Sequence, residues 1–213
     1  MSSDNYPPAV DPSHVGEYPA VVKAGGGYVW DAVLEYRVWC HPNDGSDDYF
    51  YAYCSYDEAI QAANTNASVG QCAAGSVGLD TIQFNLGAGT PTINLVSALP
   101  TVTQQLIING NTGGSTRIEL NGTAAGAGAI GVDITAGGST INDLVINRFS
   151  GAGIRMQNGS GNVVQRCWIG INAAGTAAAA NGNVGIFILN SSGHTIGGAS
   201  GAGRGVGSGA ASL

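Results

Sequence analysis

The sequence predicts an all-β fold in which short strands stack as a solenoid over most of the chain. From Asp80 onward, short β-branched runs alternate with Gly, Asn, Ser and Thr. Each run is too short for a helix and suits one strand of a stacked coil. The runs also recur in register: Thr140-Ile141 maps to Val163-Val164 one repeat later, and to Thr195-Ile196 after a second, longer interval. The shorter interval gives a coil of about 23 residues with three faces, which falls within the size range of solenoid repeats.

The longer interval indicates an insertion. Gly153-Ile154 maps to Gly185-Ile186 with the same separation as that between Val163-Val164 and Thr195-Ile196. Both pairs of segments span the same extra stretch of chain. We therefore expect residues 172–182, rich in Ala and Gly, to bulge out as a loop at one corner.

Corner positions follow from the residues between the runs. Gly and Asn permit the left-handed backbone that tight bends need, and Asn amides bond to nearby backbone or to one another. We expect the corners to hold Asn109, Asn121, Asn147 and Asn158.

Composition divides the chain into two modules. All eight tyrosines precede residue 57, whereas 30 of the 35 glycines follow residue 60. We assign residues 1–53 to an acidic, aromatic head, residues 54–79 to a helix and loop, and residues 80–213 to the solenoid. We predict a small α+β module for the head, with two antiparallel strands around an acidic turn.

Charge follows the same division. Residues 1–58 have a net charge of −8 and the remainder has +1. A polybasic field for nucleic acid or anionic lipid is therefore missing, and we expect neither as a partner. The chain begins Met1-Ser-Ser-Asp-Asn without a cationic start or an apolar run, so we predict no signal peptide, no membrane insertion and a cytoplasmic location as written.

The segment between the two modules resembles a known family. It reads Cys54-Ser-Tyr-Asp-Glu-Ala-Ile, followed by Cys72-Ala-Ala-Gly-Ser and Asp80-Thr-Ile-Gln-Phe. This order is similar to the opening of bacterial surface proteins named for a CSLREA motif, although the motif here reads CSYDEA. Later stretches such as Ile169-Gly-Ile-Asn and His194-Thr-Ile-Gly-Gly also resemble coils of that family, so the resemblance covers roughly residues 54–207.

The resemblance implies a right-handed parallel β-helix whose first coil is capped by a short amphipathic helix, and an extracellular or cell-surface location. It makes a disulfide between Cys54 and Cys72 plausible, and two buried thiols remain the alternative. The chain stops at Leu213 just after a coil begins, so we expect an uncapped C-terminal edge that invites edge-to-edge self-association.

The head resembles a small bacterial module of unknown activity whose relatives are sometimes labelled acetyltransferases. Its pattern and the CSLREA-like pattern overlap at Tyr56-Asp-Glu-Ala. A natural fusion, a gene-model artefact or a composed sequence with no evolved function would each produce this seam.

Catalytic candidates are few. A lyase or hydrolase on this fold needs clustered carboxylates, and the solenoid has four acids, of which Asp133 and Asp143 are the only close pair in sequence. Arg155 is a candidate base, and His194 lies in a Ser-Gly-His stretch. The better reading for each is structural, so we predict no catalytic residue and lean away from an enzyme.

Cofactor and metal sites are not predicted either. Asp44, Asp47 and Asp48 supply oxygen ligands, but their spacing misses the EF-hand pattern and suits a solvated turn. Arg204-Gly-Val-Gly-Ser-Gly matches an acetyl-CoA loop in letters, yet no helix follows it.

Three hypotheses follow. The first is a non-enzymatic surface solenoid that serves as a scaffold or binds glycans or a cell-surface ligand through Asn, Thr and Ser on a regular flank. The second is a polysaccharide lyase or glycoside hydrolase on a pectin-lyase-like β-helix. The third is a cytosolic protein whose function lies in the head.

Overall fold

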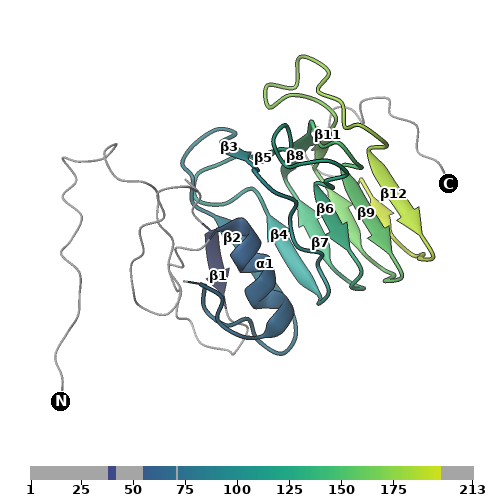
Figure 1. The fold of residues 1–213 in the computed structure, drawn as a ribbon. Helices are drawn as coiled ribbons and strands as arrows, with labels where there is room; N and C mark the ends of the chain where they lie inside the picture. Colours follow the sequence, from purple (N-terminus) through teal and green to yellow (C-terminus); the bar gives the residue numbers. More distant parts are fainter. Residues whose placement is uncertain (1–37, 42–54, 71, 198–213) are drawn as a thin grey trace, which may run out of the picture.

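The structure of this chain is a computed structural model in which residues 38–41, 55–70 and 72–197 are described. This part consists mainly of β-strands with one short α-helix (Figure 1). The elements are β1 (Val38–His41), α1 (Tyr56–Thr65), β2 (Asp80–Phe84), β3 (Thr92–Asn94), β4 (Leu106–Asn109), β5 (Ile118–Asn121), β6 (Val132–Ile134), β7 (Thr140–Asn142), β8 (Leu144–Asn147), β9 (Ile154–Gln157), β10 (Val163–Gln165), β11 (Trp168–Ile169), β12 (Ile186–Leu189) and β13 (Thr195–Ile196).

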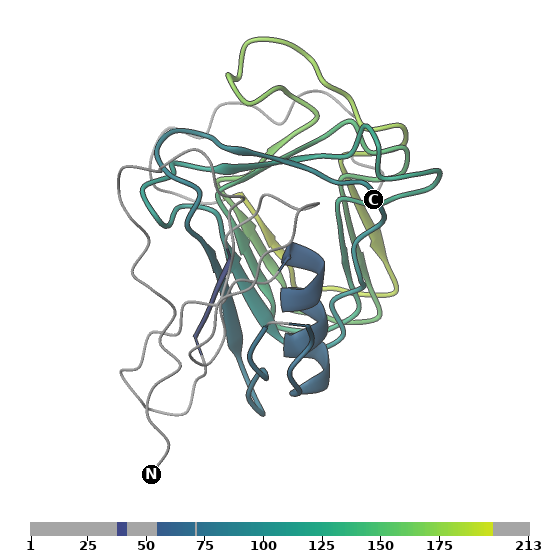
Figure 2. The ribbon, with the colours of Figure 1, turned by 60° about the vertical axis from the view of Figure 1, so that its left-hand side comes forward.

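The strands form three sheets that the chain visits in turn. Sheet 1 has the order β1-β2-β4-β7-β10-β13, sheet 2 the order β11-β8-β5-β3, and sheet 3 the order β12-β9-β6. Every pairing between these strands is parallel except that of β1 with β2. We call one passage of the chain through the three sheets a rung. Neighbouring rungs lie side by side along the molecule, and the sheets enclose one interior (Figure 2).

The register predicted from the repeat is confirmed. Val163 pairs with Thr140 and with Thr195, and Ile186 pairs with Ile154. Earlier rungs are longer: Asp80 pairs with Leu106 and Ile107 with Thr140, so their spacings exceed that of the shortest repeat. The expected insertion lies between β11 and β12, where an antiparallel bridge joins Ile171 to Ala178 and makes it a hairpin.

Inward side chains on successive rungs stack on one another to form the core. In sheet 1 the stack is Ile82, Ile108, Ile141 and Val164, each at most 3% exposed. Sheet 2 contributes the aligned Ile93, Leu120, Ile146 and Ile169. Full burial of one such side chain contributes about 1.5–3 kcal/mol, so each rung stabilises the next through the interior.

Corners between the sheets use left-handed backbone. Asp143 and Arg166 have φ of 55° and 54° and occupy equivalent corners of successive rungs, after β7 and after β10. Of the four asparagines expected in corners, Asn158 follows β9 with φ of 64°. The expectation is wrong for the other three, which are the last residues of strands β4, β5 and β8: Asn109, Asn121 and Asn147. Gly110 holds the corner of the preceding rung, where a Cβ would lie 2.1 Å from the carbonyl oxygen of Asp143. Only glycine fits that position without a shift of the backbone.

Helix α1 lies at the β2 end of the stack (Figures 1 and 2). Ser55 is its N-cap and forms a reciprocal capping box with Glu58. The helix buries Tyr56 against Phe84 of β2, with ring centroids 5.4 Å apart. At its other end, the Asn64 amide donates to the carbonyl of Thr101 and accepts from the backbone N–H of Thr103. The helix is thus attached to two sides of the first rung, in agreement with the predicted helix within residues 54–79.

One strand of the predicted head adds to sheet 1 of the solenoid, which from here on we also call the body (residues 80–197). Residues 38–41 form β1, which pairs antiparallel with β2, so that Cys40 lies opposite Ile82. The remainder of the head, including its predicted acidic turn, lies outside the described residues. Within the described part, none of the helices has the length and apolarity needed to cross a bilayer.

Candidate functional site

Asp133 and Arg155, both catalytic candidates, form a bidentate ion pair on the outer face of sheet 3. They lie directly opposite one another on β6 and β9. Nε and Nη2 of Arg155 each donate to one carboxylate oxygen of Asp133 at 2.7 Å. The hydroxyl of Thr101, one rung earlier, donates to the same carboxylate at 2.7 Å. The hydrogen bonds with Asp133 raise the pKa of the Arg155 guanidinium above its ordinary value, which makes it a poor proton acceptor.

Asp143 occupies a different side of the molecule and has its own partner. Its carboxylate accepts from Nε and Nη2 of Arg166, the equivalent corner residue one rung later, at 2.7–3.0 Å. The Asp143 side chain is 3% exposed. Asp133 and Asp143 are close in sequence, but Asp133 lies on β6 of sheet 3 and Asp143 lies at the corner after β7 of sheet 1. Each acid pairs with an arginine on the next rung and not with the other acid.

His194 contacts a serine, but with the wrong tautomer for base catalysis. The backbone N–H of Asn162 donates to Nδ1 of His194 at 3.1 Å, so Nδ1 carries no proton. The proton of the ring is therefore on Nε2, which lies 3.0 Å from the hydroxyl oxygen of Ser191 and donates to it. A histidine that donates to a serine hydroxyl cannot take its proton. The hydroxyl of Ser191 donates in turn to the carbonyl of Met156.

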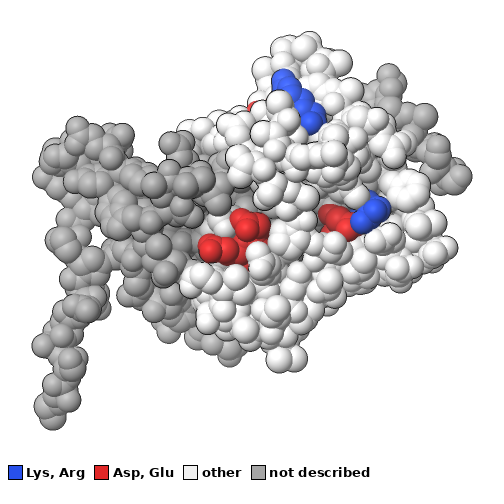
Figure 3. Space-filling model, in the orientation of Figure 1, with Lys and Arg blue, Asp and Glu red and all other residues white. Residues whose placement is uncertain are grey.

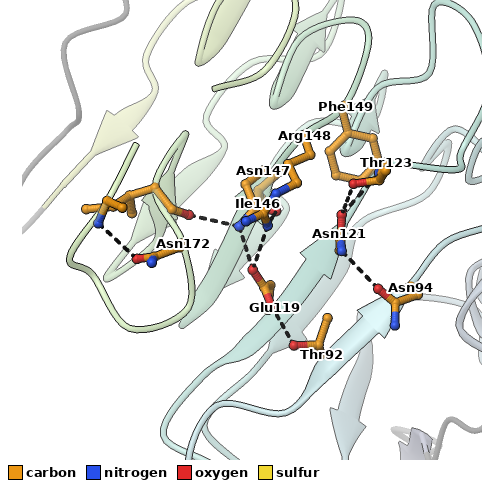
Figure 4. Close-up of polar contacts among 12 residues, drawn as sticks. Thr92, Asn94, Glu119, Asn121, Thr123, Ile146, Asn147, Arg148, Phe149 and Asn172 are labelled. Atoms are coloured by element: carbon orange, nitrogen blue, oxygen red, sulfur yellow. Dashed lines mark hydrogen bonds and ion pairs between the residues drawn. The ribbon is translucent and has the colours of Figure 1, made fainter. Parts of the chain in front are cut away.

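A third charged group lies on the outer face of sheet 2 (Figure 4). Glu119 on β5 is 6% exposed, and one of its oxygens accepts from the Asn147 amide at 2.7 Å and from Arg148 at 3.3 Å. Its other oxygen accepts from the hydroxyl of Thr92, one rung earlier. The Asn147 amide also donates to the carbonyl of Ile171, which joins the insertion hairpin to the same network.

The fourth carboxylate of the body, Asp80, points into the interior at the start of β2. One of its oxygens accepts from the backbone and hydroxyl of Ser76, and the other is buried without a hydrogen-bond partner. Burial raises the pKa of this carboxyl above its ordinary value, and the two hydrogen bonds from Ser76 oppose the shift.

Arginine side chains on the described rungs are likewise engaged. Arg148, Arg155 and Arg166 pair with carboxylates, and the guanidinium carbon of Arg117 lies 4.1 Å from the ring centroid of Trp168. This distance is that of a cation–π contact. In the view of Figure 3, charged side chains of the described part form isolated groups on a largely uncharged surface.

The insertion hairpin borders a cavity of about 380 Å³. Its lining is mainly Gly and Ala together with two isoleucines, and its polar members are Thr176, Asn181 and Asn183. Both ends of the Asn181 amide are engaged with backbone, since its oxygen accepts from Phe149 N–H and its nitrogen donates to the carbonyl of Ile146. The cavity therefore offers few polar groups to orient a ligand.

Two cysteine side chains are described, and they differ in state. Cys72 is disulfide-bonded, and because Cys54 is outside the described residues, the pairing of the two stays a prediction. Cys167 is a free thiol whose pKa is raised to about 12 by burial, so it is protonated at neutral pH.

The predicted acidic turn is also undescribed, and with it the metal candidates Asp44, Asp47 and Asp48 and the loop at Arg204. Among the described side chains, no group of three or more His, Cys, Asp or Glu residues is arranged to hold a metal ion. On the last described strands, Leu189 and Ile196 are exposed; self-association at this edge stays a prediction.

Sequence reasoning missed the partners of the acids rather than the acids themselves. Arg155 follows Asp133, and Arg166 follows Asp143, by about one repeat in each case. Applying the repeat to charged residues as well as to apolar runs would have placed each pair on adjacent rungs. Glu119 gives no such signal, because its contacts with Thr92, Asn147 and Arg148 depend on longer and less regular spacings.

Comparison with protein-family models, with curated proteins and with solved structures finds no match to this chain. The resemblance to the CSLREA-type surface proteins therefore stays an expectation from the sequence.

Proposed function

We propose that the described residues from Asp80 onward form a right-handed parallel β-helix, capped by α1, that serves as a non-enzymatic binding scaffold of the bacterial surface type. Three parallel sheets, visited in strict rotation from β4 onward, support the β-helix. Crossover connections between parallel strands are right-handed in nearly all proteins, which supports the hand. The CSLREA-like segment supports a location at the cell surface or outside the cell.

One observation carries the non-enzymatic part of the proposal. Three of the four body carboxylates bond to arginines one rung away, and the fourth, Asp80, is buried. Acid–base catalysis needs carboxyl groups and bases whose reactive atoms are available to the substrate and not engaged in other hydrogen bonds. Here the carboxylate oxygens of Glu119, Asp133 and Asp143 accept hydrogen bonds from arginines on the next rung. Among the described residues, Arg155 pairs with Asp133 and with no second carboxylate.

The charged contacts also suit a scaffold. A bidentate arginine–carboxylate pair has a fixed geometry, so a pair across two rungs favours one strand register over its neighbours. Each partner is partly or largely shielded, with side-chain exposures of 33% for Arg155 and 9% for Asp133. Such pairs are less screened by salt than fully exposed ones.

Retention and turnover measured together test the proposal. The full chain is incubated with purified bacterial cell walls and with a panel of polysaccharides that includes polygalacturonate, with and without calcium. Sedimentation measures retention, and new reducing ends or unsaturated products measure turnover. We expect retention on at least one ligand without turnover; calcium-dependent cleavage of polygalacturonate would establish a lyase instead, and retention on none would remove the binding role.

A further inference from the structure

The outer face of sheet 1 carries two straight rows of side chains. Alternation along the strands turns every second residue outward, and the parallel register aligns these residues from rung to rung. The first row is Thr81, Ile107, Thr140, Val163 and Thr195. The second row is Gln83, Asn109, Asn142 and Gln165. Adjacent members of a row are separated by about 4.7–4.9 Å, the spacing of hydrogen-bonded strands.

Polar side-chain atoms in these rows make almost no hydrogen bonds to described residues. Within the described part, the only side-chain hydrogen bond in either row is that from the Asn111 N–H to the amide oxygen of Asn109. The amide oxygen of Asn142 is buried and without any partner. The threonine hydroxyls and glutamine amides of the two rows likewise make no hydrogen bonds to described residues.

On the outer faces of sheets 2 and 3, by contrast, several polar side chains are hydrogen-bonded. On sheet 3, the hydroxyls of Thr101 and Thr135 donate to Asp133 and to the carbonyl of Val102. On sheet 2, Thr92 and Asn147 bond to Glu119. Among the described strands, free hydrogen-bonding capacity is thus concentrated on sheet 1.

Charge restricts what this face can accept. None of the nine row positions is ionisable, and the charged residues that follow the second row, Asp143 and Arg166, neutralise one another. A polyanion finds no free cation in the rows, and a polycation finds no free carboxylate. A neutral ligand with many hydroxyl groups matches both the absence of charge and the free amides.

We propose that the outer face of sheet 1 binds a neutral, linear polysaccharide that runs across the strands. Amides of the second row donate to the sugar hydroxyls, and those of Gln83 and Gln165 also accept from them, while Ile107 and Val163 in the first row contact the apolar faces of the sugar rings. This inference rests on the proposed binding function and adds the face and the ligand class to it.

The test compares variants of the full chain on cellulose, β-1,3-glucan, xylan and mannan, with polygalacturonate as the charged comparison. Thr140→Lys places a charge at the centre of the face. Asn142→Ala combined with Gln165→Ala removes two amides that bond to nothing in the described part. Gln157→Lys is the matched control, because Gln157 is a half-buried outward residue of β9 on sheet 3. Circular dichroism and the unfolding temperature establish that each variant is folded.

Wild type and Gln157→Lys are expected to bind a neutral polysaccharide equally. Each sheet 1 variant is expected to bind about tenfold more weakly, the effect of losing one or two hydrogen bonds. If Thr140→Lys fails to fold, the double alanine variant decides. Equal binding by all variants, or retention only on polygalacturonate or cell walls, would overturn this inference and leave the proposed function standing. Retention on no ligand would overturn both.

Discussion

At the scale of single residues, polar side chains of the described rungs divide into those that bond to a neighbouring rung and those without a partner among the described residues. Glu119, Asp133 and Asp143 each accept from an arginine one rung later. Asp80 is the exception, because it faces the interior and one of its oxygens has no partner. A buried, unpaired carboxylate oxygen disfavours the charged form, and this has a measurable consequence for stability.

Replacing Asp80 with Asn should make stability less dependent on pH. The folded-state pKa is raised above the ordinary value of 3.8, so the folded chain holds its proton more tightly than the unfolded chain. Wild type therefore loses stability as pH rises from the unfolded-state pKa through the folded-state pKa, a penalty absent from Asp80→Asn. Urea unfolding at several values between about pH 3 and pH 7 should show the variant gaining relative to wild type as pH rises. A constant difference across that range would contradict this assignment.

Left-handed corners give a second residue-scale prediction. Asn158 has φ of 64°, a conformation that costs about 1–2 kcal/mol for most residues with a Cβ. Asn158→Ala should lower the free energy of unfolding by about 1 kcal/mol, whereas Asn158→Gly should leave it unchanged or raise it slightly. Chemical denaturation measures both. Equal effects of the two substitutions would argue against a strained corner.

At the scale of elements, the helix and its contact with the first rung close one end of the core. Tyr56, the first residue of α1, is 1% exposed and packs on Phe84, yet its hydroxyl is buried without a hydrogen-bond partner. Burial accordingly raises the pKa of this phenol. The ring contributes packing, and the hydroxyl contributes a desolvation cost.

Tyr56→Phe should therefore be neutral or stabilising, although it deletes a polar group. Tyr56→Ala should cost about 3–5 kcal/mol, because it removes the ring that covers Phe84. Thermal and chemical unfolding compare the two variants with wild type. A loss of more than about 1 kcal/mol in Tyr56→Phe would mean that the hydroxyl has a partner, since that is the typical contribution of one hydrogen bond.

Elements were predictable to different degrees, for physical reasons. The register of β7, β10 and β13 followed from sequence because Thr140, Val163 and Thr195 begin similar β-branched runs. The helix was expected only because residues 54–84 resemble the opening of the CSLREA-type proteins, and its Ser55 cap was not recognised from the sequence. Pairing of β1 with β2 did not, because an antiparallel contact between distant segments leaves no repeat in the sequence. The ion pairs were also missed, because the repeat was applied to the apolar runs and not to Asp133, Asp143 and the arginines one rung later.

At the scale of the whole molecule, the described part reads as a stack held by apolar side chains inside and by charged pairs outside. Its stability is expected to be a sum of contacts between neighbouring rungs. Most outward polar groups described on sheets 2 and 3 bond within that stack, whereas most of those on sheet 1 have no partner among the described residues. This difference in hydrogen bonding between the outer faces is the basis for proposing a binding scaffold with one recognition surface.

The central claim is that body carboxylates act between rungs and not in catalysis, and a double-mutant cycle on Asp133 and Arg155 tests it most directly. Asp133→Asn, Arg155→Gln and the double variant are compared with wild type in chemical unfolding, and each is assayed for polysaccharide turnover. We predict a coupling of about 1 kcal/mol or more in the free energy of unfolding, and no turnover by any of the four proteins. Turnover by wild type that either single substitution abolishes, with no coupling in stability, would contradict the account.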